Sequence, residues 1–306
     1  MLLFTDYAVV DKLLYLCYNL LYFLYPRMST GNLVIVFMKP QRKDELCENK
    51  IADALGDGYS VKVIDCAVST NSELWKAAVN GEKEGTLIIA KRQTGGKGRL
   101  GRSFCSEEGG LYMSLLLKPE LSPEDTALIT PLAALAVSEA IEELLGVDTA
   151  IKWVNDVYCK SKKVCGILTE ASIDPVVSKT NFAVVGVGIN VYEPYGGFPE
   201  EIKDIAGALL PSDADEDGII NRLAANIAHR IFEYAKASFN PRALDEYRRR
   251  CFVIGKDIEV HRGGEHYGAK ALGIDERFAL IIEDENGVRK ALSSGEISVR
   301  IKDGGE

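Results

Sequence analysis

The sequence predicts an α+β fold with a mixed or mostly antiparallel sheet, followed by a small C-terminal β-barrel of SH3-like size. Two observations support this. Up to about residue 250, stretches of strand length alternate with helical patterns, and beyond that point only short strands separated by turn signals remain. With 306 residues, 47% of them hydrophobic, the chain can bury a core of useful size without disulfides or a structural metal.

Strand and helix patterns alternate through the larger, first part of the chain. The stretches with strand length and apolar or alternating character are residues 60–65, 86–90, 111–117, 151–158, 164–173 and 182–191. The stretches with a helical pattern are residues 39–54, 69–78, 123–145, 218–236 and 242–250. Since helices lie on either side of the strands in sequence, and no internal repeat is present, we expect one α+β body.

Characteristic residues mark the ends of three of these helices. Thr70 and Glu73 have the spacing of a capping box, in which each side chain bonds to the other residue's backbone amide. Ser122 is the expected N-cap of the long helix over residues 123–145, and Gly146 is placed to end it. Pro241 is placed to open the last helix, where its missing N–H costs nothing.

The C-terminal part has a different pattern. Strand-length stretches follow one another at residues 256–260, 267–274, 278–283, 288–292 and 297–301. The turn signals between them are Arg262-Gly263-Gly264, Asp275-Glu276, Asn286-Gly287 and Ser294-Gly295. So many short strands joined by tight turns predict a small antiparallel barrel at residues 251–306.

Charge and cysteine usage restrict the class of protein. The formal net charge is -9 with a pI near 5.1, and such a field repels nucleic acid and anionic lipid. The seven cysteines include no CxxC pair, and their odd number argues against a complete disulfide framework, so we expect a reducing cytoplasm. The three histidines show no metal-ligand spacing, and the sequence leaves any metal ligands unknown. A monomer and a homodimer are both compatible with these features.

Residues 1–38 form an apolar N-terminal extension. The apolar run at residues 13–25 is too short to cross a bilayer, which argues against a membrane role. It lacks a basic leader and a cleavage site, so we do not expect a signal peptide here. Two interpretations remain: an amphipathic helix docked on the body, or translated upstream sequence with Met28 or Met38 as the natural start.

The loop at residues 93–102, QTGGKGRLGR, is the segment with the clearest chemical character. It contains four glycines and three cations, Lys97, Arg99 and Arg102. Glycines let backbone N–H groups approach a ligand closely, and cations supply the countercharge, so the loop suits a phosphate or an acyl-phosphate anhydride. It lacks the spacing of a P-loop. By composition alone, a mobile basic surface loop is the competing interpretation.

Other segments decide between these interpretations. The chain contains, in order, STN (residues 69–71), the glycine-rich loop, KWVND (152–156), KKVCGIL (162–168) and GVGIN (186–190). This ordered set resembles the biotin–protein ligase family from about residue 39 to the C-terminus. The resemblance implies a class II synthetase-like catalytic domain at residues 39–250 and an SH3-like barrel at residues 251–306. It corresponds to the type without an N-terminal DNA-binding domain.

The resemblance also implies a reaction in two steps. The carboxylate of biotin attacks the α-phosphate of ATP and forms biotinyl-5′-AMP, with pyrophosphate as the leaving group. A lysine of a biotin carrier domain, for example that of acetyl-CoA carboxylase, then attacks the acyl carbon, and AMP leaves. Bringing a carboxylate to a triphosphate requires cations and Mg²⁺, and the reactive adenylate requires a loop that excludes water.

By this resemblance, one set of residues binds biotin and another binds ATP or the adenylate. The biotin-binding residues are Ser69, Thr70, Asn71, Gln93, Lys97, Gly98, Arg99 and Lys163. The residues for ATP or the adenylate are Gly96, Arg102, Lys152, Asn155, Gly188 and Asn190. Helix capping is the alternative role for the STN turn, and simple solvent exposure is the alternative for Gln93.

Lys163 and Arg99 are the expected catalytic residues. An ammonium at Lys163 would stabilise negative charge that grows on the nonbridging oxygens, and Arg99 is expected to retain the adenylate. The alternative for Lys163 is a solvated lysine in a polar turn. Trp153 is expected in the core, and Asp156 is either a metal ligand or a structural acceptor.

Two positions depart from the family pattern. Lys97 stands where the family has arginine. An ammonium cannot form the bidentate hydrogen bonds to a phosphate that a guanidinium forms. Val154 stands where proline is commoner, with little functional effect expected. Two other functions share features with this one: a lipoate-type acyl-protein ligase, which has the same fold, and a bifunctional ligase and biotin-responsive repressor. The composition of residues 1–58 argues against DNA binding.

Overall fold

The computed structural model describes residues 44–214, 216–237, 240–262, 264–293 and 297–301, and the backbone alone at residues 23–29, 32–38, 297 and 298. Strands β1 (Phe23–Ser29) and β2 (Asn32–Met38) form a two-stranded antiparallel ribbon, with Phe23 opposite Met38. A docked helix was one of the two interpretations of the apolar run at residues 13–25, and residues 13–22 of this run lie outside the described residues. Its last three residues belong to β1, because they pair with the β-branched and aromatic residues of β2.

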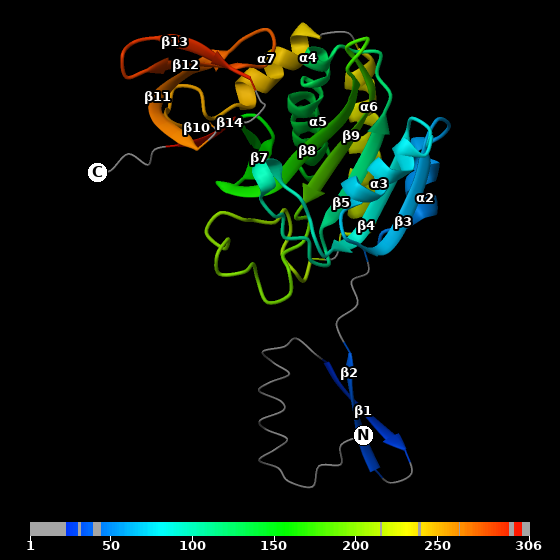
Figure 1. Ribbon diagram of the computed structural model, residues 1–306. Coiled ribbons are helices and arrows are strands. Elements are labelled where there is room, and N and C mark those ends of the chain that lie inside the picture. Colours follow the sequence, from blue (N-terminus) through cyan, green and yellow to red (C-terminus); the bar gives the residue numbers. More distant parts are fainter. Residues whose placement is uncertain are drawn as a thin grey trace, which may run out of the picture.

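A seven-stranded mixed sheet forms the body, in the order β3-β4-β5-β9-β8-β7-β6 (Figure 1). Its strands are β3 (Ser60–Ala67), β4 (Thr86–Gln93), β5 (Leu111–Leu117), β6 (Ala150–Lys152), β7 (Asp156–Cys159), β8 (Lys162–Asp174) and β9 (Lys179–Ile189). Only β3 and β4 pair in parallel. The predicted α+β class with a mostly antiparallel sheet is confirmed.

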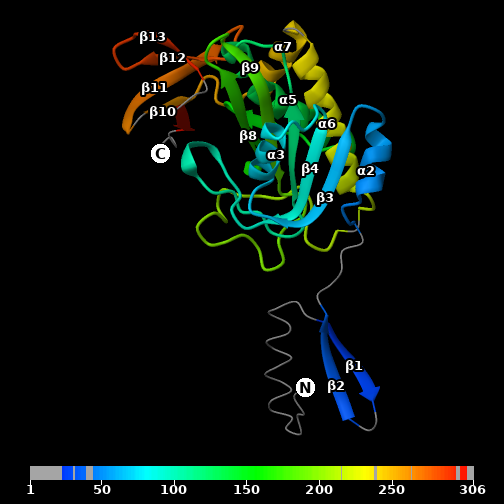
Figure 2. The ribbon, with the colours of Figure 1, turned by 45° about the vertical axis from the view of Figure 1, so that its right-hand side comes forward.

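Helices cover both faces of this sheet (Figures 1 and 2). They are α2 (Glu48–Leu55), α3 (Thr70–Val79), α4 (Pro123–Thr126), α5 (Ile129–Leu145), α6 (Ile219–Lys236) and α7 (Pro241–Arg250). On one face, Leu74 and Ala78 of α3 pack against Leu116 and Val184. The other face, under α5 and α6, holds the main core. The start of α3 therefore lies above the sheet on its less covered side.

The long helix expected over residues 123–145 is two helices. Ser122 accepts a hydrogen bond from the Asp125 amide as the N-cap of α4, and Gly146 ends α5 in the left-handed conformation, as predicted. The chain leaves α-helical hydrogen bonding at residues 127–128. Pro131 explains the break, because it has no N–H to donate to the carbonyl of Ala127.

The expected strand at residues 151–158 is a hairpin. β6 and β7 pair with each other, so that Lys152 lies opposite Asp156, and residues 153–155 form the turn between them. The apolar pattern concealed this turn because it contains neither glycine nor proline. Reversal of the chain here brings Lys152, Asn155 and Asp156 close together.

The C-terminal part is a five-stranded antiparallel sheet in the order β13-β12-β11-β10-β14. Its strands are β10 (Asp257–Arg262), β11 (Glu265–Ile274), β12 (Leu280–Asp284), β13 (Arg289–Leu292) and β14 (Ile297–Ile301). The Asn286-Gly287 turn joins β12 and β13, with Gly287 at positive φ, as expected. α7 leads into this sheet, and the main core continues into it through residues such as Ile258 and Leu280.

Within the described residues, no helix has both the length and the apolar character needed to cross a membrane.

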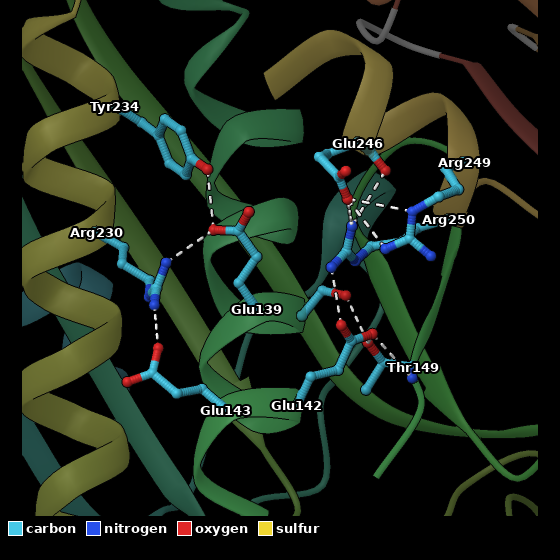
Figure 3. A network of polar contacts seen from close by, with 10 residues as sticks. Glu139, Glu142, Glu143, Thr149, Arg230, Tyr234, Glu246, Arg249 and Arg250 are labelled. Carbon is cyan, nitrogen blue, oxygen red and sulfur yellow. Dashed lines mark hydrogen bonds and ion pairs between the residues drawn. The ribbon is translucent and has the colours of Figure 1, made fainter. Parts of the chain in front are cut away.

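A polar network joins α5, α6 and α7 (Figure 3). Arg250 is 8% exposed and forms ion pairs with Glu142 of α5 and Glu246 of α7. Glu142 also accepts hydrogen bonds from the backbone and the hydroxyl of Thr149. On α6, Arg230 bonds to Glu139 and Glu143. The network therefore fastens the last helix before the C-terminal sheet to the centre of the body.

We expect this network to make the free energy of unfolding depend on pH in the acid range. Burial opposes ionisation of Glu142, but the hydrogen bonds from Thr149 and Arg250 outweigh it, so the pKa of Glu142 lies below its ordinary value. A carboxyl with a lowered folded pKa stabilises the fold above its unfolded pKa of about 4.3, and this contribution is lost as the pH falls through the folded pKa. The destabilisation of Glu142→Gln relative to wild type should therefore be largest near neutrality and shrink below about pH 4.3. Urea unfolding across this range measures it, and a pH-independent difference would contradict the assignment.

Candidate active site

The STN turn lies at the start of α3 and is almost completely buried. Ser69, Thr70 and Asn71 are 2%, 4% and 4% exposed. They line a cavity of about 30 Å³, which we call the inner cavity. Its other lining residues are Gln93, Lys97, Phe104, Met113, Gly166, Leu168 and residues 186–188. Within the described chain, the hydroxyl of Ser69 makes no hydrogen bond, so it is available to a ligand in this cavity.

The predicted capping box at Thr70 and Glu73 is wrong. The N-cap position is Ser69, and Thr70 is already inside the helix. The Thr70 hydroxyl donates to Gln93 Oε1 (3.2 Å), and the Thr70 backbone amide donates to the same oxygen (2.8 Å). Gln93, at the end of β4, thus accepts from the Thr70 backbone amide, which the Glu73 side chain would have bonded in a capping box. Its alternative role as a solvent-facing residue is excluded by these contacts.

Glycines on neighbouring strands form the floor of the inner cavity. Gly166 of β8 lies opposite Gly188 of β9, and a Cβ added at Gly188 would lie 2.8 Å from the ring of Phe104. A Cβ at Gly186 would lie 2.1 Å from Asn71 Oδ1. Side chains at these positions would fill the cavity, so the glycines of the GVGIN and GIL segments make room above the sheet.

The glycine-rich loop folds back on itself above this floor. The Phe104 amide donates to the Gly96 carbonyl (2.9 Å), and the Gly98 amide donates to the Arg102 carbonyl (2.7 Å). A Cβ at Gly96 would lie 2.4 Å from the Phe104 carbonyl, so only glycine allows this close approach. The loop thereby presents Lys97 and Phe104 to the inner cavity.

A second cavity, of about 110 Å³, adjoins the first, and we call it the outer cavity. It is lined by residues 97–100, 102–104, 152–153, 155–156, 163, 166–167 and 299. Lys97, Phe104 and Gly166 line both cavities. Five cations surround the outer cavity: Lys97, Arg99, Arg102, Lys152 and Lys163. Such a concentration of positive charge in a protein of net charge -9 favours an anionic ligand.

Asp156 is the one carboxylate among the residues that line the outer cavity. Its Oδ1 lies 2.7 Å from Lys163 Nζ, and both side chains are about one quarter exposed or less. Burial lowers the pKa values of Lys152 and Arg99, while the charge of Asp156 acts in the opposite direction on both. In this structure Asp156 therefore acts as an acceptor for Lys163. Within the described residues, no cluster of three or more potential metal ligands occurs.

The turn between β6 and β7 connects the outer cavity to the C-terminal sheet. Asn155 accepts a hydrogen bond from Arg99 Nη1 (3.1 Å) and donates to the Ile167 carbonyl (2.8 Å). Next to it, Trp153 Nε1 donates to the Phe278 carbonyl (2.9 Å), and the Tyr247 hydroxyl donates to the Val154 carbonyl (3.1 Å). Trp153 is 4% exposed, so its predicted place in the core is confirmed.

If Asn155 contacts ATP, as the resemblance implies, Tyr247→Phe should weaken ATP binding as well as stability. The substitution removes the hydroxyl that holds the Val154 carbonyl and leaves a buried acceptor unpaired, at a cost of about 1–3 kcal/mol. Since the turn also carries Asn155, we expect a raised KM for ATP. Tyr234→Phe is the matched control, because that hydroxyl bonds to Glu139 between α5 and α6, away from both cavities. Equal KM values for ATP in the two variants would contradict a role of the turn in the site.

The structure brings most of the predicted site residues together. The inner cavity contains Ser69, Thr70, Asn71, Gln93, Lys97 and Gly188, and the outer cavity contains Lys97, Gly98, Arg99, Arg102, Lys152, Asn155 and Lys163. Of the two cavities, Lys163 lines only the outer one. Gly96 and Asn190 line neither cavity, and the Asn190 side chain donates instead to the Gly207 carbonyl (2.9 Å).

Phe104, Ser114 and Glu170 are among the residues at the site that were not anticipated from the sequence. Phe104 lies between the two cavities, and Ser114 and Glu170 lie directly behind the STN turn. Ser114 did carry a signal, because it is a small polar residue in the otherwise apolar stretch LYMSLLL. Glu170 and Phe104 carry no local signal, since only the folded sheet and loop bring them here.

Comparisons with known proteins agree with this geometry. Residues 63–190 match the profile of the biotin/lipoate A/B protein ligase family, and residues 253–300 match that of the biotin protein ligase C-terminal domain. The chain is 37% identical over 235 residues to the bifunctional ligase/repressor BirA of Bacillus subtilis, covering 75% of this chain and 71% of that protein. The chain belongs to the biotin/lipoate A/B protein ligase family.

Two further relatives extend the similarity within the family. The biotin–[acetyl-CoA-carboxylase] ligase of Mycobacterium tuberculosis is 30% identical over 266 residues, covering 82% of this chain and 95% of that protein. The biotin protein ligase from Aquifex aeolicus in complex with biotin and ATP has a TM-score of 0.65 and 31% identity, covering 79% and 99% of the two chains. The resemblance predicted from the ordered motifs is thus confirmed.

Proposed function

We propose that the chain is an ATP-dependent ligase that activates biotin as biotinyl-5′-AMP and transfers it to a lysine of a biotin carrier domain. The observation that carries this proposal is the meeting of two cavities at Lys97, Phe104 and Gly166. Apart from Lys97, which lines both cavities, the inner cavity offers neutral polar groups, and the outer cavity offers cations. A molecule with a polar, uncharged head and a carboxylate tail matches this pair, because its carboxylate would lie among the cations.

Relatives within the family support the same reaction. The Mycobacterium tuberculosis relative is named a biotin–[acetyl-CoA-carboxylase] ligase, and the Aquifex aeolicus structure contains biotin and ATP. Biotin and ATP are accordingly the substrates of this chain, and a biotin carrier protein is its partner. The function predicted from the sequence motifs agrees with both relatives.

In the first step, the cations of the outer cavity bring two anionic substrates together. Biotin's carboxylate oxygen attacks the α-phosphorus, and the bond to the pyrophosphate oxygen breaks. Lys163 is fixed by Asp156 at 2.7 Å and can place its ammonium against the nonbridging oxygens, where negative charge grows. Lys97, Arg102 and Lys152 screen the remaining phosphate charge.

Mg²⁺ is part of this proposal. Asp156 supplies a single carboxylate and Asn155 an amide oxygen at the outer cavity. This set fits Mg²⁺ that is held mainly by phosphate oxygens and water, because Mg²⁺ in nucleotide sites takes only one or two protein carboxylates. It does not fit a metal held by protein alone. The ion would supply further neutralisation of the phosphates.

In the second step, the carrier lysine attacks the acyl carbon and AMP leaves with the acyl oxygen. Until then the mixed anhydride must be kept from water. The glycine-rich loop carries Arg99 over the outer cavity, and Phe104 covers the glycine floor. We propose that these residues retain the adenylate. A cytoplasmic location, favoured by the cysteine usage, completes the proposal.

Exchange of labelled pyrophosphate into ATP tests the function. We expect exchange that depends on biotin, and no exchange when lipoate replaces it. Lipoate is the comparison of choice because the family includes ligases for both acids. Exchange with lipoate alone would identify a lipoate-type ligase instead. Transfer to a carrier domain is then measured as an increase in the carrier's mass. A gel shift with biotinyl-adenylate present tests the repressor function named for the Bacillus subtilis relative.

A further inference from the structure

Asn71 is held from two sides, by strand β8 and by strand β5. Its Nδ2 donates to Glu170 Oε2 (2.9 Å) and to the Leu168 carbonyl (3.1 Å). Its Oδ1 accepts from the Ser114 hydroxyl at 2.6 Å. Both protons of the amide nitrogen are thus used by β8, and the oxygen is turned toward β5. Asn71 therefore links the STN turn to two strands of the sheet, and its amide orientation is fixed by these partners.

Ser114 belongs to the same arrangement and is fully buried. It lies in β5 opposite Gly186, directly beneath the start of α3. Its hydroxyl lies 2.6 Å from Asn71 Oδ1 and 2.8 Å from Thr70 Oγ1. A hydroxyl has one proton, so it can donate to one of these oxygens at a time. Gly186 makes this approach possible, because a Cβ there would collide with Asn71.

The arrangement continues from Thr70 to the other side of the inner cavity. Thr70 donates through its amide and its hydroxyl to Gln93 Oε1, and Gln93 Nε2 donates to Ser106 Oγ (2.9 Å). Since its oxygen faces Thr70, Gln93 can present only its remaining N–H to a ligand. The orientation of a lining residue is therefore set by a chain of hydrogen bonds that begins at Ser114.

We propose that Ser114 and Glu170 are positioning residues for biotin, which fix the STN turn and Gln93 without touching the ligand. This inference rests on the proposed function. Its physical basis is that a site for a small polar head gains affinity from donors and acceptors that are already oriented, and buried polar networks are costly when one member is left unpaired. The hydrogen bonds of this network that are described above involve none of the cations of the outer cavity, so we expect its loss to act on biotin and not on ATP.

The test compares steady-state pyrophosphate exchange in four variants. Ser114→Ala removes the hydroxyl, and Ser138→Ala is its matched control. Ser138 is also fully buried and bonds by its hydroxyl to Thr149, away from both cavities. Glu170→Leu removes the acceptor for Asn71, whereas Glu170→Gln keeps a carboxamide oxygen in its place. Thermal unfolding is measured for all four, and the half-buried Glu170 provides an independent arm should Ser114→Ala fail to fold.

We expect the KM for biotin to rise about tenfold or more in Ser114→Ala and Glu170→Leu, with the KM for ATP and kcat changed by less than about threefold. Ser138→Ala and Glu170→Gln should keep a KM for biotin near that of wild type. A KM for biotin within about twofold of wild type in both Ser114→Ala and Glu170→Leu overturns the proposal. Parallel loss in Glu170→Gln overturns the role of the hydrogen bond.

Failure of this inference is distinguishable from failure of the proposed function. If wild-type protein shows no biotin-dependent exchange, the function itself is wrong. If wild type exchanges normally and the variants match it, only the positioning role falls. Calorimetric titration with biotin in the absence of ATP provides the same comparison for binding alone, since it requires no reaction.

Discussion

Lys163→Ala should depress biotin-dependent pyrophosphate exchange by about 10²–10³-fold, which is the usual cost of removing one preorganised charge from a developing oxyanion. The physical reason lies in how the ammonium is held. Asp156 fixes Nζ at 2.7 Å, and the Lys163 backbone is bound on both sides, by the Ile205 carbonyl (2.8 Å) and the Gly207 amide (2.9 Å). A charge fixed this firmly needs little reorganisation when the α-phosphate reacts.

Lys162→Ala is the matched control for this prediction. Lys162 is the neighbouring residue on β8, but its ammonium bonds to the carbonyls of Lys203 and Asp204 and lines neither cavity. It should exchange pyrophosphate at close to the wild-type rate. Thermal unfolding of both variants separates chemistry from folding. If Lys163→Ala retains wild-type exchange, or if Lys162→Ala loses as much, Lys163 does not stabilise the reacting phosphate.

The fold could be predicted where the signal is local. The strands β4, β5 and β9 were each visible as a run of apolar residues, because both faces of the central sheet are covered. The β6–β7 hairpin was missed for the opposite reason. Its turn at residues 153–155 contains neither glycine nor proline and is stabilised by distant partners, Phe278 and Tyr247. A local pattern cannot contain such contacts.

The site shows the same division. The STN, glycine-loop, KWVND and KKVCGIL segments were recognised by their order, and the structure gathers them around two adjoining cavities. Sequence did not show that Asn190 turns away toward Gly207, or that Asp156 holds Lys163. Both depend on pairing between strands far apart in the chain. The same is true of Ser114 and Glu170, which reach Asn71 only across the assembled sheet.

Arg99→Gly should release biotinyl-5′-AMP into solution. Arg99 lines the outer cavity from the glycine-rich loop and donates to Asn155 across it, so its guanidinium links the loop to the β6–β7 turn. Loss of one hydrogen bond to a charged group costs about 1.5–3 kcal/mol, which corresponds to about a 10–100-fold faster escape of the adenylate. Adenylate formation depends more on Lys163 and should persist. The released anhydride should then label exposed lysines of bystander proteins.

Two measurements check this prediction in one reaction mixture. Free biotinyl-5′-AMP is quantified after filtration of the enzyme, and biotin transfer is followed on a carrier domain mixed with an unrelated protein such as albumin. Arg92→Gly is the matched control, because Arg92 is exposed on β4 just before the loop and lines neither cavity. It should label the carrier alone. Wild-type selectivity in Arg99→Gly would show that other groups retain the adenylate. Arg102 and Lys97 would then be the residues to substitute, since they line the same cavity from the same loop.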